Sequence, residues 1–343
     1  MSNRSSIRND IALTGVGDTG GITVNTDFLE IGGVSFVGSE NRGSGNGGDI
    51  TFNTSSFILN NRSIVGNELS EGAVGQAGNV VINSDSVSIT QQTGIDTTTA
   101  GNGNAGNIII NARESIFFDD GSELRSEALA TALGNGGEII IDTVDLDLNG
   151  TTLFVTATFA SGNSGNLQIE SENISLSESS RLSAETNSSG NAGEVNINTA
   201  TLNLADGSII SSATFDRGNA NQINIQASES IVIDDSDIFS QVPVVETIDV
   251  VNGEGVLNRT IGTGNGGDIV ISTGSLSLLN GGQINTSTFG VGDGGDIVIQ
   301  AAEGITLSGI SDRINQFSSG IGSSVNFALG NAGDILISTA DLV

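Results

Sequence analysis

The chain has 343 residues with 40 acidic and 10 basic side chains, which gives a formal net charge of −30. This charge argues against nucleic acid and against an anionic membrane surface as partners, because both are bound through clustered cations. Cysteine is absent, which excludes disulfides and thiolate metal sites. No run approaches the ~20 apolar residues that a membrane-spanning helix needs.

A glycine-rich motif of six residues recurs along the whole chain. The copies are Gly45–Ile50, Gly75–Val80, Gly103–Ile108, Gly134–Ile139, Gly162–Leu167, Gly190–Val195, Gly264–Ile269, Gly292–Ile297 and Gly330–Ile335, with weaker copies at Gly17–Ile22 and Gly218–Ile223. Seven of the ten intervals between copies are 28 or 30 residues. A fixed period of this size is typical of a solenoid, in which each repeat buries its apolar face only against its neighbours.

Each repeat contains three short segments with the pattern of β strands. The first follows the motif, as in Val195–Ile197, and the second begins about seven residues later, as in Leu202–Leu204. Alternation of apolar and polar residues at period 2 predicts strands with one face in the core. The third segments are centred on Ile64, Ile95, Leu124, Leu153, Leu182, Ile209, Ile238 and Ile284 and are followed by Ser and Thr.

Three strands and three turns in about 28 residues predict an all-β, single-stranded parallel β-helix of about 11 coils. Strands this short must pair with the equivalent strand of the next coil, about 4.8 Å away. We expect residues 1–343 to form one continuous solenoid with incomplete coils at both ends. Ile7–Ile11 reads as a third strand and Ile337–Val343 stops as a second strand begins, which is the pattern of a segment from a longer protein.

Two longer intervals predict insertion loops, at about 240–260 and 309–329. Insertions in solenoids form loops on one face, and such loops often bind partners. Candidate partner-binding residues are Asp249 and Arg259 in the first loop and Arg313 and Phe317 in the second. The alternative is that both loops are tolerated without a function.

Polar residues of the motif are expected to stack from coil to coil. Asn104, Asn135, Asn163, Asn191 and Asn219 share one position, where their amides can form a ladder. Acidic residues fill another motif position in several coils, and a Ca²⁺ ion between Asp268 and Asp296 would relieve their repulsion. The alternative is a solvated turn with screened charge and no cofactor.

Two further patterns allow different functions. Asp119–Asp120 and Asp234–Asp237 are candidate acid pairs for sugar hydrolysis, but both fall at turns, where Asp is common for conformational reasons. The outward residue of the first strand is apolar in three early and three late coils, and polar in the three coils between them. Such rows favour lateral self-association, or they reflect only the β propensity of a flat sheet. The apolar members are Val81, Ile109, Ile140, Val270, Val298 and Leu336.

The motif, the following Leu-x-Leu, the Asn/Asp-Gly turn and the Ile-x-Thr/Ser strand resemble the repeats of filamentous-haemagglutinin-like exoproteins, especially large cyanobacterial ones. The resemblance covers essentially the whole chain. It implies a right-handed parallel β-helix that is exported by two-partner secretion through an outer-membrane pore and acts in adhesion at the cell surface. The family's secretion domain carries Asn-Pro-Asn-type motifs, whereas the single proline here is Pro243, after Val242.

These observations predict a non-enzymatic extracellular adhesin, or the rod-like stalk of one, whose partners are surface or matrix glycans or proteins. A self-associating surface-layer or matrix protein is the main alternative. A polysaccharide-active β-helix enzyme is the third, although the enzymes of that shape that cut polygalacturonate use a His and an Arg-x-Lys element, and this chain has neither His nor Lys.

Overall fold

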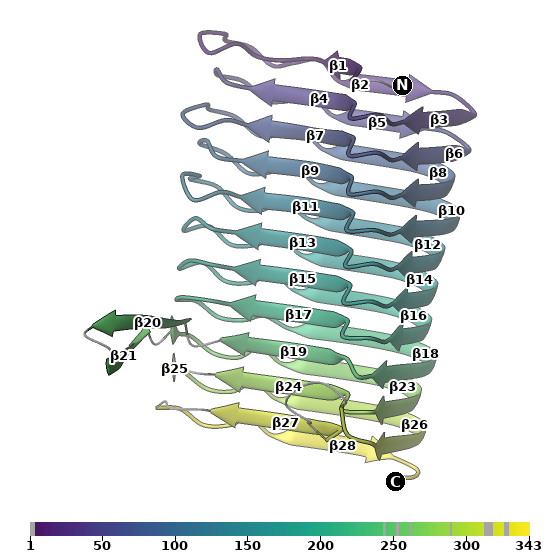
Figure 1. Ribbon diagram of the computed structural model, residues 1–343, viewed down its shortest axis with the longest axis vertical. Coiled ribbons are helices and arrows are strands. Elements are labelled where there is room, and N and C mark those ends of the chain that lie inside the picture. Colours follow the sequence, from purple (N-terminus) through teal and green to yellow (C-terminus); the bar gives the residue numbers. More distant parts are fainter. Residues whose placement is uncertain are drawn as a thin grey trace.

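The computed structural model describes residues 4–242, 245–251, 254–260, 262–288, 290–311, 318–325 and 329–343. Every regular element in these ranges is a β strand. The coils stack along one axis with the two termini at opposite ends (Figure 1). The fold is a parallel β-solenoid of about 10 turns with repeats of about 29 residues, which confirms the predicted fold class.

One sheet contains the third strand of every coil. Its neighbours pair in parallel throughout, with equivalent residues of successive coils in register, for example Leu124 with Ile95 and Phe154. In order along the rod its strands are β1 (Ser6–Arg8), β4 (Phe36–Asn41), β7 (Ile64–Leu69), β9 (Gly94–Thr99), β11 (Glu123–Ala128), β13 (Leu153–Thr158), β15 (Arg181–Thr186), β17 (Ile209–Thr214), β19 (Asp237–Val242), β24 (Gln283–Thr288) and β27 (Gly320–Val325). We call it the third-strand sheet.

A second sheet contains the first and second strands of each coil. Its strands are β2 (Ile22–Asn25), β3 (Phe28–Ile31), β5 (Ile50–Asn53), β6 (Ser56–Leu59), β8 (Val80–Ile89), β10 (Ile108–Phe118), β12 (Ile139–Leu148), β14 (Leu167–Leu176), β16 (Val195–Leu204), β18 (Ile223–Asp234), β23 (Ile269–Leu279), β26 (Ile297–Ser308) and β28 (Ile335–Thr339). The expected three-strand coil occurs only near the N-terminus. From β8 to β26 the first two strands are one bent strand of 10–12 residues.

A small residue at the bend explains how one strand makes this turn. In coils with Ser or Thr there, the hydroxyl donates to the carbonyl oxygen two residues later, as Thr199 does to Thr201 at 2.9 Å. Coils with Ala at this position have no such donor and instead carry one extra residue at the bend. These coils contain Ala112, Ala227 and Ala301. A local side-chain bond and a β-bulge are therefore two ways to bend the strand.

The core lies between the two sheets as one continuous apolar cluster. Aromatic rings connect the sheets in one place, where Phe118 and Phe154 pack edge to face with their centroids 4.7 Å apart. The third strand differs from expectation in three coils, where Val65, Phe154 and Ile210 are fully buried and the residue before each faces outward. Adjacent apolar residues such as Ile209 and Ile210 make period 2 ambiguous.

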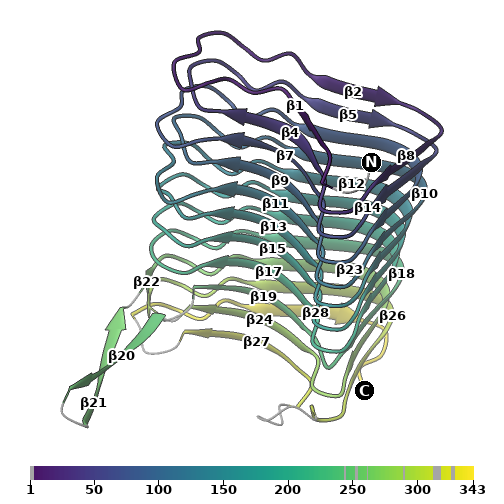
Figure 2. The same cartoon turned by 45° about the horizontal axis from the view of Figure 1, so that its top comes forward.

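Two corners connect the sheets, and Figure 2 shows how they superimpose along the rod. The motif corner contains the glycine-rich motif, and the second corner joins the second strand to the third. At the motif corner the coils approach closely: a Cβ on Gly193 would lie 1.8 Å from the carbonyl oxygen of Gly165. Steric contact, rather than the positive φ usually associated with glycine, therefore favours glycine at this fourth motif position, where Asn221 is the exception in one coil.

The first expected insertion contains an antiparallel hairpin. Its strands are β20 (Val245–Val251) and β21 (Glu254–Thr260), and the hairpin extends away from the side of the solenoid (Figures 1 and 2). Next to it, the short strands β22 (Gly262–Thr263) and β25 (Gly290–Val291) pair in parallel. Part of the second expected insertion is regular, because β27 pairs with β24 and continues the third-strand sheet.

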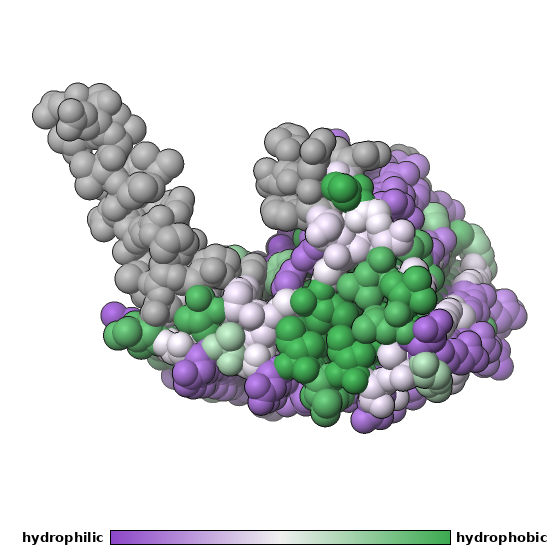
Figure 3. Space-filling view, turned by 90° about the horizontal axis from the view of Figure 1, so that it is seen from below, coloured by the Kyte–Doolittle hydropathy of each residue, from purple (hydrophilic) through white to green (hydrophobic). Residues whose placement is uncertain are grey.

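The first and last segments of the chain occupy the strand positions that the sequence predicts. Ser6–Arg8 pairs with the third strand of the next coil, and Leu342 forms a bridge to Ile305, in the second half of a long strand. At the C-terminal end the apolar side chains reach the surface, which Figure 3 views directly. Exposed residues there include Leu336, Leu342 and Val343.

Candidate functional site

The motif corner carries a continuous hydrogen-bonded series that we call the motif ladder. The side-chain oxygen of each second motif residue accepts the backbone N–H of the equivalent residue in the next coil, at 2.6–3.0 Å. The ladder runs through Asp18, Asn46, Gln76, Asn104, Asn135, Asn163, Asn191, Asn219, Asn265, Asp293 and Asn331. The predicted stacking is confirmed, but the bonds join side chains to backbone rather than amide to amide.

The candidate cation ligands Asp268 and Asp296 belong to a parallel series at the fifth motif position. The Asp268 carboxylate accepts the backbone N–H of Asp296 at 2.8 Å, and Asp296 accepts that of Asp334 at 2.7 Å. Backbone donors therefore stabilise these stacked carboxylates from the neighbouring coil. Across the described ranges, no three Asp, Glu, His or Cys side chains come together as a metal-binding group. Asn107 and Asn166 accept the equivalent bond in other coils, so this position uses either a carboxylate or an amide oxygen as acceptor.

The candidate acid pairs lie at the second corner, as the turn interpretation predicted. Asp120 and Asp235 have φ of +58° and +47°, in the left-handed region that Asp tolerates better than most residues. The Asp119 carboxylate accepts the N–H of Asp120 at 2.7 Å, and Asp234 accepts the side-chain amide of Asn280 at 2.8 Å. The carboxylates of Asp119 and Asp234, which precede the left-handed residues, thus accept hydrogen bonds from groups in the turns.

The candidate partner-binding residues are not brought together in the described structure. Asp249 lies in β20, opposite Val256, and Arg259 lies in β21, opposite Glu246. The two therefore occupy different positions along the hairpin. Arg313 and Phe317 lie outside the described residues.

The outward apolar rows align as the sequence predicts. Val81, Ile109 and Ile140 are register partners in successive coils, as are Val270, Val298 and Leu336, and the row between them is polar. All of them except Leu336 are only partly exposed. The rows lie on the outer surface of the first-strand half of the long strands, so they form two flat apolar stripes.

Sequence reasoning missed a charged cluster on the outer face of the third-strand sheet. Arg125 lies between Glu123 and Glu127, with N–O distances of 2.7 and 2.9 Å, and Asp96 is its register partner in the preceding coil. Burial raises the pKa of Asp96 to about 7; Glu123 adds to this rise and Arg125 opposes it. Burial likewise raises the pKa of Glu127 against the attraction of Arg125. The spacing Glu-x-Arg-x-Glu, which puts all three on one face of a strand, was the available signal.

The bend of the long strands forms a polar groove. Asn53, Asn83 and Asn111 make an amide ladder there, with each side-chain N–H₂ bonded to the preceding amide oxygen at 2.8–2.9 Å, starting from Asn25. Arg113 forms an ion pair with Asp85 in the same groove. Asp142 and Glu170 continue its lining in later coils. In its N-terminal part, the Asn ladder and the Arg113–Asp85 pair thus bond its polar groups to each other.

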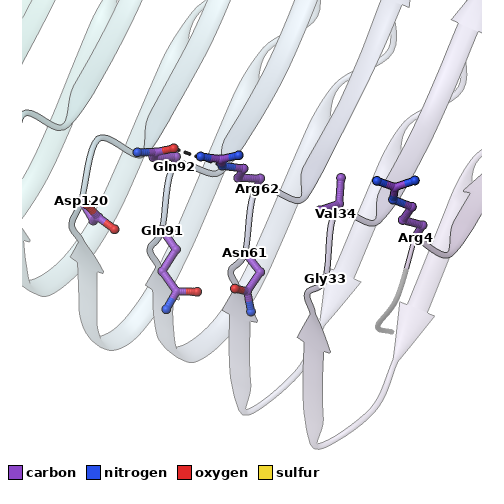
Figure 4. A pocket seen from close by; sticks show the side chains of 8 residues that line it. All are labelled: Arg4, Gly33, Val34, Asn61, Arg62, Gln91, Gln92 and Asp120. Atoms are coloured by element: carbon purple, nitrogen blue, oxygen red, sulfur yellow. Dashed lines mark hydrogen bonds between the residues drawn. The ribbon is translucent and has the colours of Figure 1, made fainter.

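A separate hollow of about 700 Å³ lies at the second corner near the N-terminal end (Figure 4). We call it the corner hollow. Its lining residues come from the turns of successive coils and are Arg4, Gly33, Val34, Asn61, Arg62, Gln91, Gln92 and Asp120. Arg62 donates from Nε to the side-chain oxygen of Gln92 at 3.2 Å. The sequence indicated turns here but gave no reason to group these residues.

Comparison with protein-family models, with curated proteins and with solved structures found no match. Within the described part of the chain, no helix has the length and hydropathy needed to cross a membrane. The interpretation of these surfaces therefore depends on their own geometry.

Proposed function

We propose that this chain is a rod-like, non-enzymatic segment of an extracellular adhesin of the filamentous-haemagglutinin-like type. The observation that carries the proposal is the uninterrupted parallel register from β1 to β27, with a hairpin extending from one side. A rod of this kind holds a binding element away from the surface to which it is anchored. The repeat motif that resembles secreted exoproteins supports the same function.

The internal use of polar side chains agrees with a structural role. The side-chain oxygen of Asn163 accepts a backbone N–H from the next coil, and that of Asp268 does the same. Equivalent residues in other coils repeat these bonds. Asp119 and Asp234 are engaged at turns in the same way. We therefore propose a stalk that needs no catalytic group and no cofactor. Export through an outer-membrane pore and display at the outer cell surface are part of this proposal.

An adhesion assay tests the proposal. Beads that carry the chain should adhere to cells or to matrix polysaccharide, and beads that carry a variant without residues 245–260 should show whether the hairpin contributes. The coil around the deletion should remain intact, because β19 pairs directly with β24. Failure of the complete chain to adhere to any such surface, or release of reducing ends from a polysaccharide, would contradict it.

Lateral self-association is the second candidate, and the aligned apolar rows favour it. Val270 and Val298 lie side by side on the outer surface, with Leu336 in the next coil. Parallel rods could bury such stripes against each other. Val298→Asp should then weaken the association and lower the average sedimentation coefficient of the sample. An unchanged sedimentation profile would eliminate this candidate.

A further inference from the structure

Two arginines without ion-pair partners face the corner hollow. Five of the described arginines form ion pairs with acidic side chains: Arg8, Arg42, Arg113, Arg125 and Arg181. Arg217 forms none, but it lies outside the corner hollow. Arg4 and Arg62 form none either, although the chain carries 40 acidic residues. Both are exposed, and both line the same hollow. In a chain with this excess of acid, two unpaired guanidinium groups in one hollow indicate a place for an external anion.

The stacking of the coils sets the spacing between these two groups. The backbone N–H of Arg4 bonds to Gly33, that of Val34 to Asn61 and that of Arg62 to Gln91, so Arg4, Val34 and Arg62 form one column of equivalent positions. Arg4 and Arg62 are thus two coils apart, about 10 Å at the spacing of parallel β strands. Figure 4 shows both side chains on the same side of the turns, with Val34 between them.

The backbone at this column is unfavourable for the residues that occupy it. Val34, Arg62 and Gln92 have φ of +61°, +56° and +57°, where a side chain costs free energy and glycine does not. Equivalent turns elsewhere contain Gly121 and Gly207 at the same position, and also Thr151 and Ser179 with φ of +61° and +64°. The fold therefore accepts glycine here, and the presence of Arg and Gln in the corner hollow has no structural requirement behind it.

We propose that the corner hollow binds a carboxylate-bearing polysaccharide, a polyuronate, that lies parallel to the rod axis. Arg4 and Arg62 each pair with one carboxylate, and guanidinium groups suit this because they bind carboxylates through two parallel N–H donors. In an extended polyuronate, carboxylates that face one surface recur on every second sugar. Arg4 and Arg62 are two coils apart, with one coil between them. A hexose ring is about as long as the spacing between neighbouring coils, so every second carboxylate meets an arginine.

The other lining residues fit a sugar chain better than a compact anion. Gln92 lies beside Arg62 and supplies an amide donor and acceptor for hydroxyl groups, whereas Asn61 and Gln91 come from the preceding turn position and point to the other side of the turns (Figure 4). Val34 offers an apolar contact between the two arginines. Asp120 lies at the rim towards the C-terminus and repels a carboxylate there, so it sets the end of the anionic subsite. The proposal rests on the adhesive function above and names its ligand class.

Calorimetric titration of the complete chain with a galacturonate hexamer tests this inference. The buffer contains a chelator and physiological salt, at which distant acidic residues are screened beyond about 8 Å. We expect the hexamer to bind and its methyl ester to fail. Arg4→Gln and Arg62→Gln should each weaken binding about tenfold, because each removes a charge-assisted pair. Asp120→Asn should strengthen binding.

Two control variants separate binding from folding. Arg62→Gly removes the guanidinium and relieves the backbone, so binding should fall while the melting temperature does not. Arg113→Gln removes a highly exposed arginine at the bend groove and should leave binding unchanged. Equal binding of acid and ester, or unchanged binding by Arg62→Gln and Arg62→Gly, would overturn the inference.

The bead assay distinguishes this inference from the proposed function. Suppose that beads with the native chain and beads with Arg62→Gln adhere equally well and that the hexamer does not bind. The adhesive function then stands, and the corner hollow is eliminated as its binding site. Absence of adhesion by the native chain to every surface contradicts the adhesive function itself.

Discussion

The two corners of each coil differ in how strongly the fold restricts their residues. At the motif corner, glycine recurs because neighbouring coils touch there, and Asn, Asp or Gln recurs because its side chain bonds the next coil. At the second corner the fold demands only a left-handed backbone, and Gly, Val, Arg, Gln, Thr and Ser all occupy the same column. Strong repetition therefore marks structure in this chain, and variation within a fixed geometry marks positions that are available for binding.

The sharpest test of the restricted corner is Gly193→Ala. The new Cβ would meet the carbonyl oxygen of Gly165 at 1.8 Å, so the coils must separate. We expect a loss of about 3 kcal/mol in the free energy of unfolding, the upper range for overpacking. Chemical denaturation measures it. Gly304→Ala is the control, since its nearest neighbour is 3.7 Å away; equal losses in both variants would contradict steric restriction.

A second test uses the charged cluster around Asp96 and Arg125. The carboxyl of Asp96 has its pKa raised from 3.8 to about 7, mainly by burial. The folded state therefore binds a proton more tightly than the unfolded state, and this group's contribution to stability is full below pH 3.8 and is lost as the pH rises towards 7. Three pKa units correspond to about 4 kcal/mol, and partial solvent contact reduces this to about 2 kcal/mol.

Asp96→Asn should accordingly stabilise the protein by about 2 kcal/mol at pH 8 and have little effect at pH 4. Denaturation curves at both pH values measure the difference. Glu127→Gln is the comparison variant, because it also removes a buried carboxylate but breaks the 2.9 Å pair with Arg125. A stability difference between Asp96→Asn and the native chain that does not vary with pH would contradict the assignment.

The smallest expected effect concerns one step of the motif ladder. Asn163→Ala leaves the backbone N–H of Asn191 without its side-chain acceptor. The N–H is exposed to water, so we expect a loss of only about 1 kcal/mol. Asn163→Asp keeps the acceptor, as Asp18 and Asp293 do elsewhere in the ladder, and should retain native stability. Equal destabilisation by Ala and Asp would show that the bond contributes nothing.

The same contrast explains which features could be predicted from the sequence. The coil length and register follow from the motif, since identical residues stack on each other. The facing of the third strand was ambiguous because pairs such as Leu153 and Phe154 are both apolar, and only packing decides between them. The fusion of the first two strands depends on a hydroxyl or an extra residue at the bend, a signal of one position per coil.

The corner hollow could not be predicted for a different reason. Arg4, Val34, Arg62 and Gln92 share no residue type, and their common feature is the backbone geometry of one column. A repeat is recognised at positions where successive coils carry the same residue type, whereas the corner hollow is formed at positions where the residue type differs from coil to coil. In the charged cluster, Glu123, Arg125 and Glu127 lie on one strand, but Asp96 joins them only through the register of β9 and β11.

The motif ladder also has a direction. Every side-chain acceptor in it faces the coil that follows in the chain. The side-chain oxygen of Asn135, for example, accepts the backbone N–H of Asn163, whereas the side chain of Asn163 does not accept from Asn135. A completed coil thus presents the side-chain acceptors of the ladder only towards the C-terminus. The rod can therefore assemble vectorially, with each coil serving as a template for the next one in the chain.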